Sequence, residues 1–335
     1  MSIVRWGLLS TARINRRVIP AIRASARGRL VAVASRDQAV AKAYASQWEI
    51  PGAFGSYESM LESDDIDAVY NPLPNHLHAD WTVFALERGK HVLCEKPFAV
   101  RLMDVDRMVE AASRNRRALA EAFMYRHHPQ TKKVGQWIKE GRLGEVALVR
   151  GVFSFQLADP ANIRMKPEMG GGCLWDVGVY PLSFAQYVFG GAPASVVGEQ
   201  TLSESGVDVD FIGQMSYGAG RLAQIASSFR TPFNTSIEVI GRDARLTLDR
   251  PFISGDDGTP RELTLYPASG APEVTRTADT QPYLHEVEDM HDVILDGARP
   301  YLSLDETRLH ILTALALYAS AATGQKVELG SFRPQ

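Results

Sequence analysis

The first 125 or so residues alternate short apolar runs with stretches of helical periodicity, and this alternation limits the folds open to the chain. The apolar runs, typical of buried strands, cover residues 3–9, 30–34, 66–70, 91–94 and 119–123. The helical stretches between them cover residues 13–24, 39–48, 76–87 and 103–112. Strands that alternate with helices across short connections require a parallel sheet with helices on both faces. We therefore predict a doubly wound α/β domain.

Beyond residue 126 the pattern changes to successive strands. After one helix at 130–140, strand-like segments follow at 146–157, 194–202, 207–217, 221–229, 236–240, 246–248 and 263–266. Successive strands of this kind predict an open, mainly antiparallel sheet. Helices are predicted to close the chain at 284–295 and 304–323. Because 335 residues exceed one ordinary core, we expect two domains, an α/β domain at 1–123 and an α+β domain at 124–335.

Charge and hydropathy argue against several classes of partner. The formal charge is −3 at pH 7, and no block of like charge is long enough to form a tail for a polyanion. The longest apolar stretch, 311–322, is too short to span a bilayer. We therefore predict no nucleic-acid partner and no membrane partner.

Cysteine usage and the start of the chain favour a cytoplasmic location. Cys94 and Cys173 show neither metal-type nor thioredoxin-type spacing, which predicts two buried thiols in a reducing compartment. The sequence begins directly with a strand pattern, without an apolar leader. We expect an intracellular protein.

The turn after the first strand is a candidate dinucleotide site. In a doubly wound sheet of the Rossmann type this turn receives a pyrophosphate, because backbone N–H groups and a helix N-terminus converge there. The usual fingerprint has three glycines, whereas the aligned positions here are Ser10, Ala12 and Asn15. The small side chains are tolerable, so we predict cofactor contacts from Ser10, Thr11, Ala12, Arg13 and Ile14. An ordinary strand-to-helix turn is the alternative.

The end of the second strand bears on the choice between NAD and NADP. A carboxylate there bonds the ribose hydroxyls of NAD, whereas a hydroxyl and an arginine accept the extra phosphate of NADP. The chain offers Ser35 and Arg36, and Asp37 lies one residue too late for the ribose. The sequence favours NADP over NAD.

A stiff loop follows the predicted strand 66–70, at the carboxyl edge where such sheets bind ligands. The predicted cofactor contacts in this loop are Leu73, Pro74, Asn75 and His78. The His76-x-His78 spacing suggests a metal, but no carboxylate or third histidine stands at ligand spacing. We predict no metal, and expect His78 to make a hydrogen bond in or beside the cofactor cleft.

Two further segments place ionisable groups at element ends. Glu95-Lys96-Pro97 follows the predicted strand 91–94, and the segment 170–180 reads GGGCLWDVGVY. With Pro74-Asn75-His76-Leu77-His78 and with the segment 121–126, these motifs make the chain resemble the Gfo/Idh/MocA family over nearly its whole length. The resemblance is strongest to the branch that holds dimeric dihydrodiol dehydrogenases, xylose dehydrogenases and sugar 3-ketoreductases.

The resemblance implies catalytic roles for Lys96, Asp176 and Tyr180 and cofactor contacts for Glu95 and Lys96, with Lys96 beside the nicotinamide. Residues four apart lie on one helix face, and Pro181 is acceptable only in a first turn, so we expect the helix to start near Asp176. A neighbouring ammonium favours phenolate over phenol. Tyr180 is then the acid/base, Lys96 assists it and bonds the substrate oxygen, and Asp176 orients substrate or Lys96. A packed tyrosine that caps a helix is the alternative.

Candidate substrate contacts are Arg126, Arg164 and Trp175. A guanidinium fork can bond vicinal hydroxyls, and an indole offers an apolar face to a sugar ring. Each of these residues could equally belong to the surface or to an interface.

The leading hypothesis is a cytoplasmic NAD(P)-dependent oxidoreductase that acts on a secondary alcohol or ketone of a sugar, with residues 124–335 binding the substrate and forming the oligomer. One alternative is a trans-dihydrodiol dehydrogenase. Another, from a different class, is a non-catalytic NAD(P)-sensing regulator, which has no need for Lys96, Asp176 and Tyr180. The resemblance also implies a homodimer or homotetramer that pairs the outer faces of the open sheet.

Overall fold

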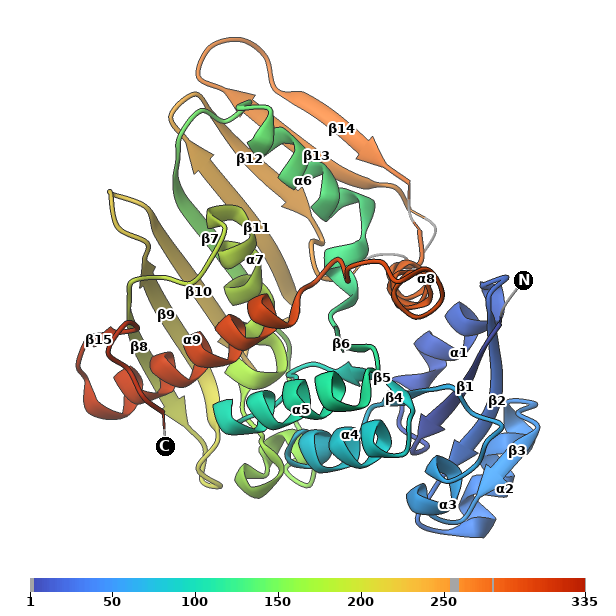
Figure 1. Cartoon of the computed structure of the whole chain (residues 1–335). Helices are drawn as coiled ribbons and strands as arrows, with labels where there is room; N and C mark the ends of the chain where they lie inside the picture. Colours follow the sequence, from blue (N-terminus) through green and yellow to red (C-terminus); the bar gives the residue numbers. More distant parts are fainter. Residues whose placement is uncertain (1–2, 254–258, 279, 335) are drawn as a thin grey trace. The chain divides into compact units, whose positions relative to one another are not determined.

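The computed structural model describes residues 3–253, 259–278 and 280–334 (Figure 1). The chain divides into two compact units. Unit 1 comprises Met1–Ala99, Met103–His127 and Gln281–Thr307. Unit 2 comprises Val100–Leu102, His128–Thr280 and Arg308–Gln335.

Unit 1 is built on a parallel sheet with the strand order β3-β2-β1-β4-β5-β6. Its strands are β1 (Val4–Leu9), β2 (Gly28–Ala34), β3 (Gly52–Phe54), β4 (Ala68–Asn71), β5 (His91–Glu95) and β6 (Leu119–Ala122). Its helices include α1 (Asn15–Ala24), α2 (Gln38–Gln47), α3 (Tyr57–Leu61), α4 (His78–Glu87) and α5 (Leu102–Asn115). The order reverses between β1 and β4, the place where doubly wound sheets bind ligands at their carboxyl edge. The predicted doubly wound domain is confirmed.

The helix α8 (Pro282–Asp296) packs in unit 1, on the face of the sheet that α1 also covers. Val287 and Met290 are buried in a core with Trp6 and Tyr70. The indole Nε1 of Trp6 donates to Nε2 of His291 at 2.9 Å. These contacts join α8 to β1 and β4, far away in the sequence.

The predicted division at residues 123 and 124 separates the two sheets, but it differs from the structure in three segments. Two are short, since residues 124–127 belong to unit 1 and Val100–Leu102 belong to unit 2. The third is Gln281–Thr307, which the prediction assigns to the second domain and which belongs to unit 1. The periodicity of α8 marks an apolar face without indicating which sheet covers it.

Unit 2 is built on a sheet with the strand order β14-β13-β12-β11-β7-β10-β9-β8-β15. Its strands are β7 (Val146–Ser154), β8 (Ser195–Leu202), β9 (Asp208–Ser216), β10 (Leu222–Ser228), β11 (Asn234–Gly241), β12 (Ala244–Asp249), β13 (Arg261–Pro267), β14 (Glu273–Thr277) and β15 (Val327–Glu328). The pairings are antiparallel except for β7 with β10, which is parallel. The predicted open, mainly antiparallel sheet is confirmed.

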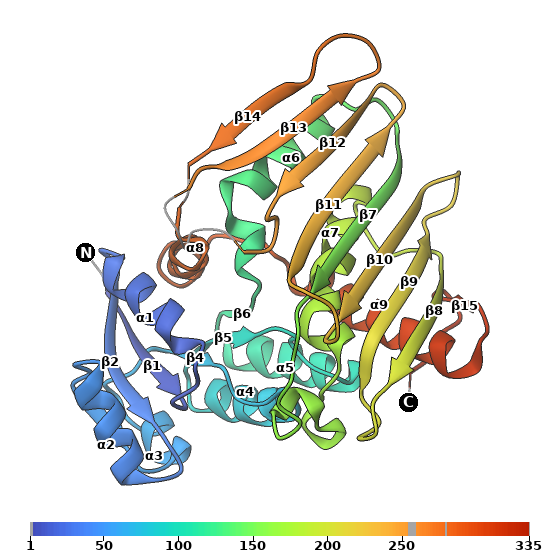
Figure 2. The ribbon, with the colours of Figure 1, turned by 180° about the vertical axis from the view of Figure 1, so that it is seen from behind.

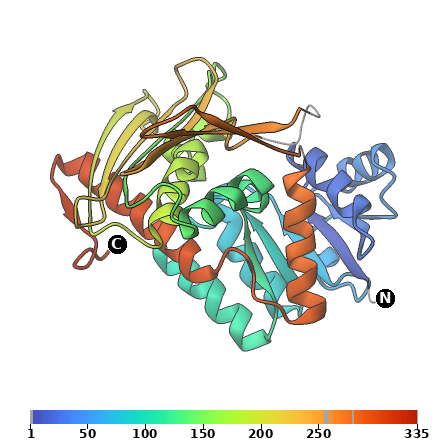
Figure 3. The ribbon, with the colours of Figure 1, turned by 90° about the horizontal axis from the view of Figure 1, so that it is seen from above.

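Helices cover one face of the unit 2 sheet. They are α6 (Pro129–Lys139), α7 (Val179–Phe189) and α9 (Leu304–Thr323) (Figures 2 and 3). The side chain of Gln186 on α7 donates to Oγ1 of Thr313 on α9 at 2.7 Å, which ties two of these helices together. Among the described elements of unit 2, none covers the opposite face of the sheet (Figure 2). None of the helices in the described ranges has the length and apolar character of a membrane span.

Glu286 is a buried acid on the sheet-facing side of α8. Its side chain is 2% exposed, and neither carboxyl oxygen has a hydrogen-bond partner among the described residues. Burial raises the pKa of Glu286 well above its ordinary value, and the nearby charges of Glu95, Asp289 and Glu121 raise it further. Folding therefore favours the protonated form of this carboxyl group.

We expect Glu286→Gln to make the protein relatively more stable as pH rises. A group whose pKa is raised by folding contributes its stability fully below its unfolded pKa, here 4.5, and that contribution is lost as pH rises toward the folded pKa. The free energy of unfolding of the unsubstituted protein should fall relative to the variant by up to about 1.4 kcal/mol per pH unit in this window. Urea unfolding from pH 5 to pH 8 measures the difference.

The matched control is Glu110→Gln, because Glu110 is exposed on α5. Its stability difference from the unsubstituted protein should not change with pH. If the curves of Glu286→Gln and the unsubstituted protein run parallel, Glu286 is ionised in the fold.

Candidate functional site

The turn after β1 has the geometry of a glycine turn without a glycine. Ser10 has φ of 100°, in the left-handed region that glycine adopts readily. Nδ2 of Asn15 donates to the carbonyl oxygen of Ser10 at 2.8 Å, and Asn15 is fully buried. The residue before α1, Ile14, makes no side-chain cap. The first N–H groups of α1 itself donate to the carbonyl oxygens of residues 12–14, so the N–H groups of residues 11–14 are the candidates for binding an anion. Residues 10–14 fit a dinucleotide pyrophosphate.

At the end of β2, the side chain of Asp37 caps the next helix and the side chain of Arg36 is exposed. Oδ1 of Asp37 caps α2, where it accepts from the backbone N–H groups of Ala39 and Val40 at 2.7 and 3.1 Å. The carboxylate is thus used within the protein, in agreement with its predicted position one residue beyond the ribose. Ser35 is half-buried and Arg36 is exposed, so both remain suited to the adenosine end of a dinucleotide.

His78 joins the loop after β4 to the segment that follows β5. Its Nδ1 lies 2.9 Å from the carbonyl oxygen of Pro97, and its Nε2 lies 2.7 Å from that of Leu73. Burial lowers the pKa of His78 to about 4, although the two carbonyl groups oppose this shift. The structure therefore gives His78 a bridging role inside the protein. Pro74 and Asn75 are half-buried on the same loop.

Lys96 follows β5 directly, at the carboxyl edge of the sheet. The backbone N–H of Lys96 donates to Oε2 of Glu95 at 3.1 Å, and the hydroxyl of Tyr70 donates to the other oxygen of that carboxylate. Burial raises the pKa of Glu95, while the charge of Lys96 opposes the rise. The carboxyl group of Glu95 is thus held by protein groups and fixes the backbone from which the Lys96 side chain extends.

Arg126 is engaged within unit 1. It is 2% exposed, and its Nη2 lies 3.1 Å from Oε1 of Glu306. Its guanidinium also lies 5.9 Å from the ring centroid of Tyr301. These contacts account for the residue structurally, and its role in substrate binding stays a prediction.

In unit 2, the GGG segment enters a tight turn that only glycine allows. Gly172 has φ of +121°, and a Cβ atom there would lie 2.0 Å from Oδ1 of Asp208. Asp208 in turn accepts from the N–H of Leu174 at 2.7 Å, from the hydroxyl of Tyr318 at 2.8 Å and from the thiol of Cys173 at 3.1 Å. This buried carboxylate anchors the start of the next helix. No local sequence signal singled out Asp208.

That helix starts as a π-helical turn, Leu174–Gly178, and continues as α7. Such turns are rare and recur at functional sites. Asp176 lies in the π-helical turn, and Pro181 is the third residue of α7. Because the π-helical turn precedes α7 without a break, Pro181 lies inside the continuous helix and not in its first turn, which corrects the prediction. Tyr180, between Asp176 and Pro181, is 7% exposed and packs its ring 5.3 Å from that of Phe153 and 5.4 Å from that of Phe252.

Two of the predicted site residues in unit 2 are ion-paired with each other. Nε of Arg164 lies 2.6 Å from Oδ2 of Asp176. The Arg164 side chain is 42% exposed and that of Asp176 is 12% exposed. Trp175 is 6% exposed and packs its ring 5.5 Å from that of Tyr318. The ion pair orients the carboxylate of Asp176, and part of the Arg164 side chain is exposed to solvent. Trp175 mainly packs inside the protein.

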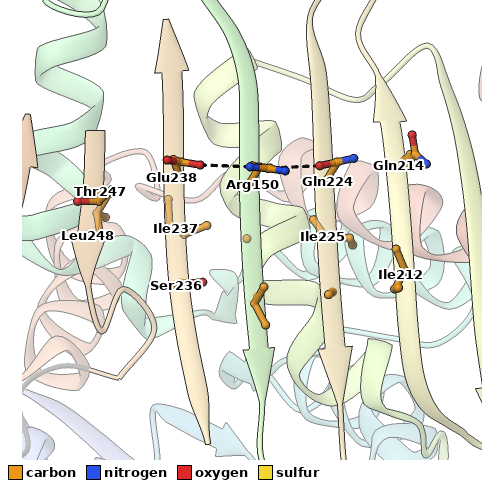
Figure 4. A pocket seen from close by; sticks show the side chains of 13 residues that line it. Arg150, Ile212, Gln214, Gln224, Ile225, Ser236, Ile237, Glu238, Thr247 and Leu248 are labelled. Carbon is orange, nitrogen blue, oxygen red and sulfur yellow. Dashed lines mark hydrogen bonds and ion pairs between the residues drawn. The ribbon is translucent and has the colours of Figure 1, made fainter. Parts of the chain in front are cut away.

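The described residues contain no cluster of three or more histidine, cysteine, aspartate or glutamate side chains that could hold a metal ion. A shallow hollow lies on the uncovered face of the unit 2 sheet, between Ile212 and Glu238 (Figure 4). Arg150 spans it, with Nε 3.2 Å from Oε1 of Gln224. The hollow contains none of the predicted catalytic residues.

Comparison with known proteins identifies both parts of the chain. Residues 4–123 match the model of the oxidoreductase family with an NAD-binding Rossmann fold. Residues 131–247 match the GFO/IDH/MocA C-terminal domain. Together the two matches cover most of the chain.

Curated relatives are similar over most of the length. A D-xylose 1-dehydrogenase (NADP(+)) of Haloferax volcanii is 40% identical, over 97% of this chain and 99% of the relative. A dTDP-3,4-didehydro-2,6-dideoxy-α-D-glucose 3-reductase of Saccharopolyspora spinosa is 37% identical, over 74% of this chain and 75% of the relative.

Solved structures share the fold. KijD10, a 3-ketoreductase from Actinomadura kijaniata in complex with NADP and TDP-benzene, has a TM-score of 0.89 at 27% identity, covering 95% of this chain and 98% of that one. Other structures of KijD10 carry one tyrosine changed to phenylalanine or one lysine changed to alanine. The chain thus belongs to the GFO/IDH/MocA family of NAD(P)-dependent sugar oxidoreductases.

Proposed function

We propose that the chain transfers a hydride between a nicotinamide cofactor and a secondary alcohol or ketone of a sugar, with Tyr180 as acid/base and Lys96 as its assistant. The observation that carries the proposal is the joint presence of Lys96, Asp176 and Tyr180. In KijD10, the lysine and the tyrosine replaced in the crystallised variants are separated by the same number of residues as Lys96 and Tyr180. A protein that only senses the cofactor has no chemical need for these three groups.

The residues of unit 1 hold the cofactor in this proposal. Backbone N–H groups of residues 11–14 and the side chain of Ser10 bind the pyrophosphate, and Ser35 and Arg36 bind the adenosine end. Leu73, Pro74 and Asn75 line the same carboxyl edge. When bound, the dinucleotide supplies the hydride acceptor or donor.

The protein moves the proton. During oxidation an alcohol loses a hydride from carbon and a proton from oxygen, and Tyr180 accepts that proton. During reduction Tyr180 returns it to the ketone oxygen. The Lys96 ammonium bonds the same oxygen and favours the phenolate form of the tyrosine. Asp176, held by Arg164, orients the substrate or the lysine.

A trans-dihydrodiol dehydrogenase remains the second candidate. A curated trans-1,2-dihydrobenzene-1,2-diol dehydrogenase of Xenopus laevis is 32% identical over 71% of this chain and 72% of that relative. Such an enzyme would use the same proton chemistry on an apolar diol. Turnover of monosaccharides and dihydrodiols with each cofactor, followed by the absorbance of the reduced nicotinamide, distinguishes the two activities.

We also propose a cytoplasmic location. The buried thiols of Cys94 and Cys173, which form no disulfide, are compatible with a reducing compartment.

Tyr180→Phe tests the acid/base role. Loss of the hydroxyl should lower kcat by about 10²- to 10⁴-fold, because general acid–base catalysis typically contributes that much. The dissociation constant of the cofactor should stay within about threefold, since the proposal assigns Tyr180 no cofactor contact. Tyr187→Phe, on the same helix, is the matched control and should keep kcat. A Tyr180→Phe enzyme with near-normal kcat refutes the assignment.

Arg36→Ala tests the preference for NADP. A hydrogen bond to a charged group is worth about 1.5–3 kcal/mol, so loss of the guanidinium should weaken NADP binding by about 10- to 100-fold and leave NAD binding unchanged. Titration of each cofactor by fluorescence measures both constants. Arg29→Ala, at the amino end of β2, should affect neither. A wild-type protein that prefers NAD contradicts the proposal.

The uncovered face of the unit 2 sheet is proposed to pair with a second copy of the chain. Ile212 and Leu222 are 58% and 50% exposed on this sheet. Arg150 and Glu238 stand side by side on neighbouring strands, so the face carries both signs of charge and is complementary to itself (Figure 4). Exposed apolar residues around a paired charge are typical of an interface.

Ile212→Glu should convert the proposed dimer or tetramer into a monomer, because a carboxylate would be buried without a partner at the interface. Size-exclusion chromatography with light scattering measures the mass. Met103→Glu, at a residue 57% exposed on α5, should leave the mass unchanged. A wild-type protein of monomer mass overturns the proposal.

A further inference from the structure

The turn after β1 contains a residue in a costly conformation. A residue with a Cβ atom pays about 1–2 kcal/mol to adopt the left-handed region, and Ser10 adopts it with φ of 100°. Such a conformation persists only where the surroundings impose it. The groups that hold Ser10 are therefore the key to this turn.

Hydrogen bonds hold Ser10 on both sides. Its N–H donates to the carbonyl oxygen of Ala34 on β2 at 3.1 Å. Its own carbonyl oxygen accepts from Nδ2 of Asn15 at 2.8 Å. The first bond restrains the peptide group before the Ser10 Cα atom and the second restrains the peptide group after it, so both backbone angles of Ser10 are restrained.

The position and burial of Asn15 hold its side chain against Ser10. It is the first residue of α1, is fully buried, and its own N–H donates to the carbonyl oxygen of Ala12 at 3.1 Å. The amide must point Nδ2 at Ser10, because the opposite orientation would place two acceptor oxygens against each other. Tyr44 on α2 faces the same side chain, and this contact opposes the rise in the pKa of Tyr44 that burial causes.

We propose that Asn15 is a positioning residue for the cofactor: its amide holds Ser10 in a glycine-like conformation, so that the N–H groups of residues 11–14 point at the pyrophosphate without a glycine in the turn. The inference rests on the proposed binding of the dinucleotide at this turn. It assigns a positive role to a residue at the position where the usual fingerprint has its third glycine.

The proposal makes an unusual prediction about restoring the glycines. Asn15→Gly, which restores the fingerprint at its third position, should weaken cofactor binding by about tenfold, because it releases Ser10 into conformations that turn the N–H groups away. Ser10→Gly alone should change the dissociation constant by less than about threefold, because glycine adopts this conformation without support. The double variant should bind within about threefold of wild type.

Calorimetric or fluorescence titration of NADP and NADPH into the four proteins gives the dissociation constants, independently of turnover. Asn115→Ala is the matched control. Nδ2 of Asn115, at the end of α5, also donates to a backbone carbonyl oxygen, that of Ala111, at 2.8 Å. This variant should leave the dissociation constant unchanged. Asn15→Asp keeps the volume and removes the donor, so it should bind weakly even if the glycine variant unfolds.

The outcomes separate this inference from the proposed site. Ala12→Arg fills the turn and should abolish cofactor binding; if it binds as wild type does, the dinucleotide site itself is misplaced. If Ala12→Arg abolishes binding while Asn15→Gly and Asn15→Asp bind normally, only the role of Asn15 is overturned. A double variant as weak as Asn15→Gly also overturns it, because Asn15 would then act other than through Ser10.

Discussion

Parallel pairing of β1 with both β2 and β4 is the constraint on which the cofactor end depends. In the sheet, β2 lies on one side of β1 and β4 lies on the other, so the strand order reverses at β1. The carboxyl ends of the strands form the ligand-binding edge at this point. Ser10 follows β1, Ser35 follows β2 and Lys96 follows β5. Residues that lie far apart in the chain are therefore placed at one edge of the sheet. The strand pairing alone is sufficient for this placement.

Buried polar side chains then hold each functional turn. Asn15 holds Ser10, Glu95 holds the N–H of Lys96, and Asp208 holds the N–H of Leu174. A buried polar group costs free energy unless it is bonded, so each of these groups favours one backbone conformation over the alternatives. Turns restrained in this way hold their backbone groups in place without help from a ligand.

Much of the fold could be predicted because hydrophobic period is a local property. The two sheet types and most long elements follow from it. The strand Gly52–Phe54 and the helix Tyr57–Leu61 were not predicted, since so few residues show no period. The assignment of α8 to unit 1 was also outside the reach of sequence, because an apolar helix face does not specify its partner. Lys96 and Tyr180 stand in motifs that the sequence alone singles out as candidates, whereas Asp208 gives no local signal.

The order and type of the long elements, and the residue types at their ends, were determined by the sequence alone, since both depend on neighbours along the chain. Only the tertiary structure decided which groups meet. It paired Arg164 with Asp176 and Arg126 with Glu306. It also buried Glu286, whose carboxyl oxygens have no hydrogen-bond partner among the described residues. The physical reason is that such pairings depend on packing free energy summed over elements distant in sequence, and no local pattern records that sum.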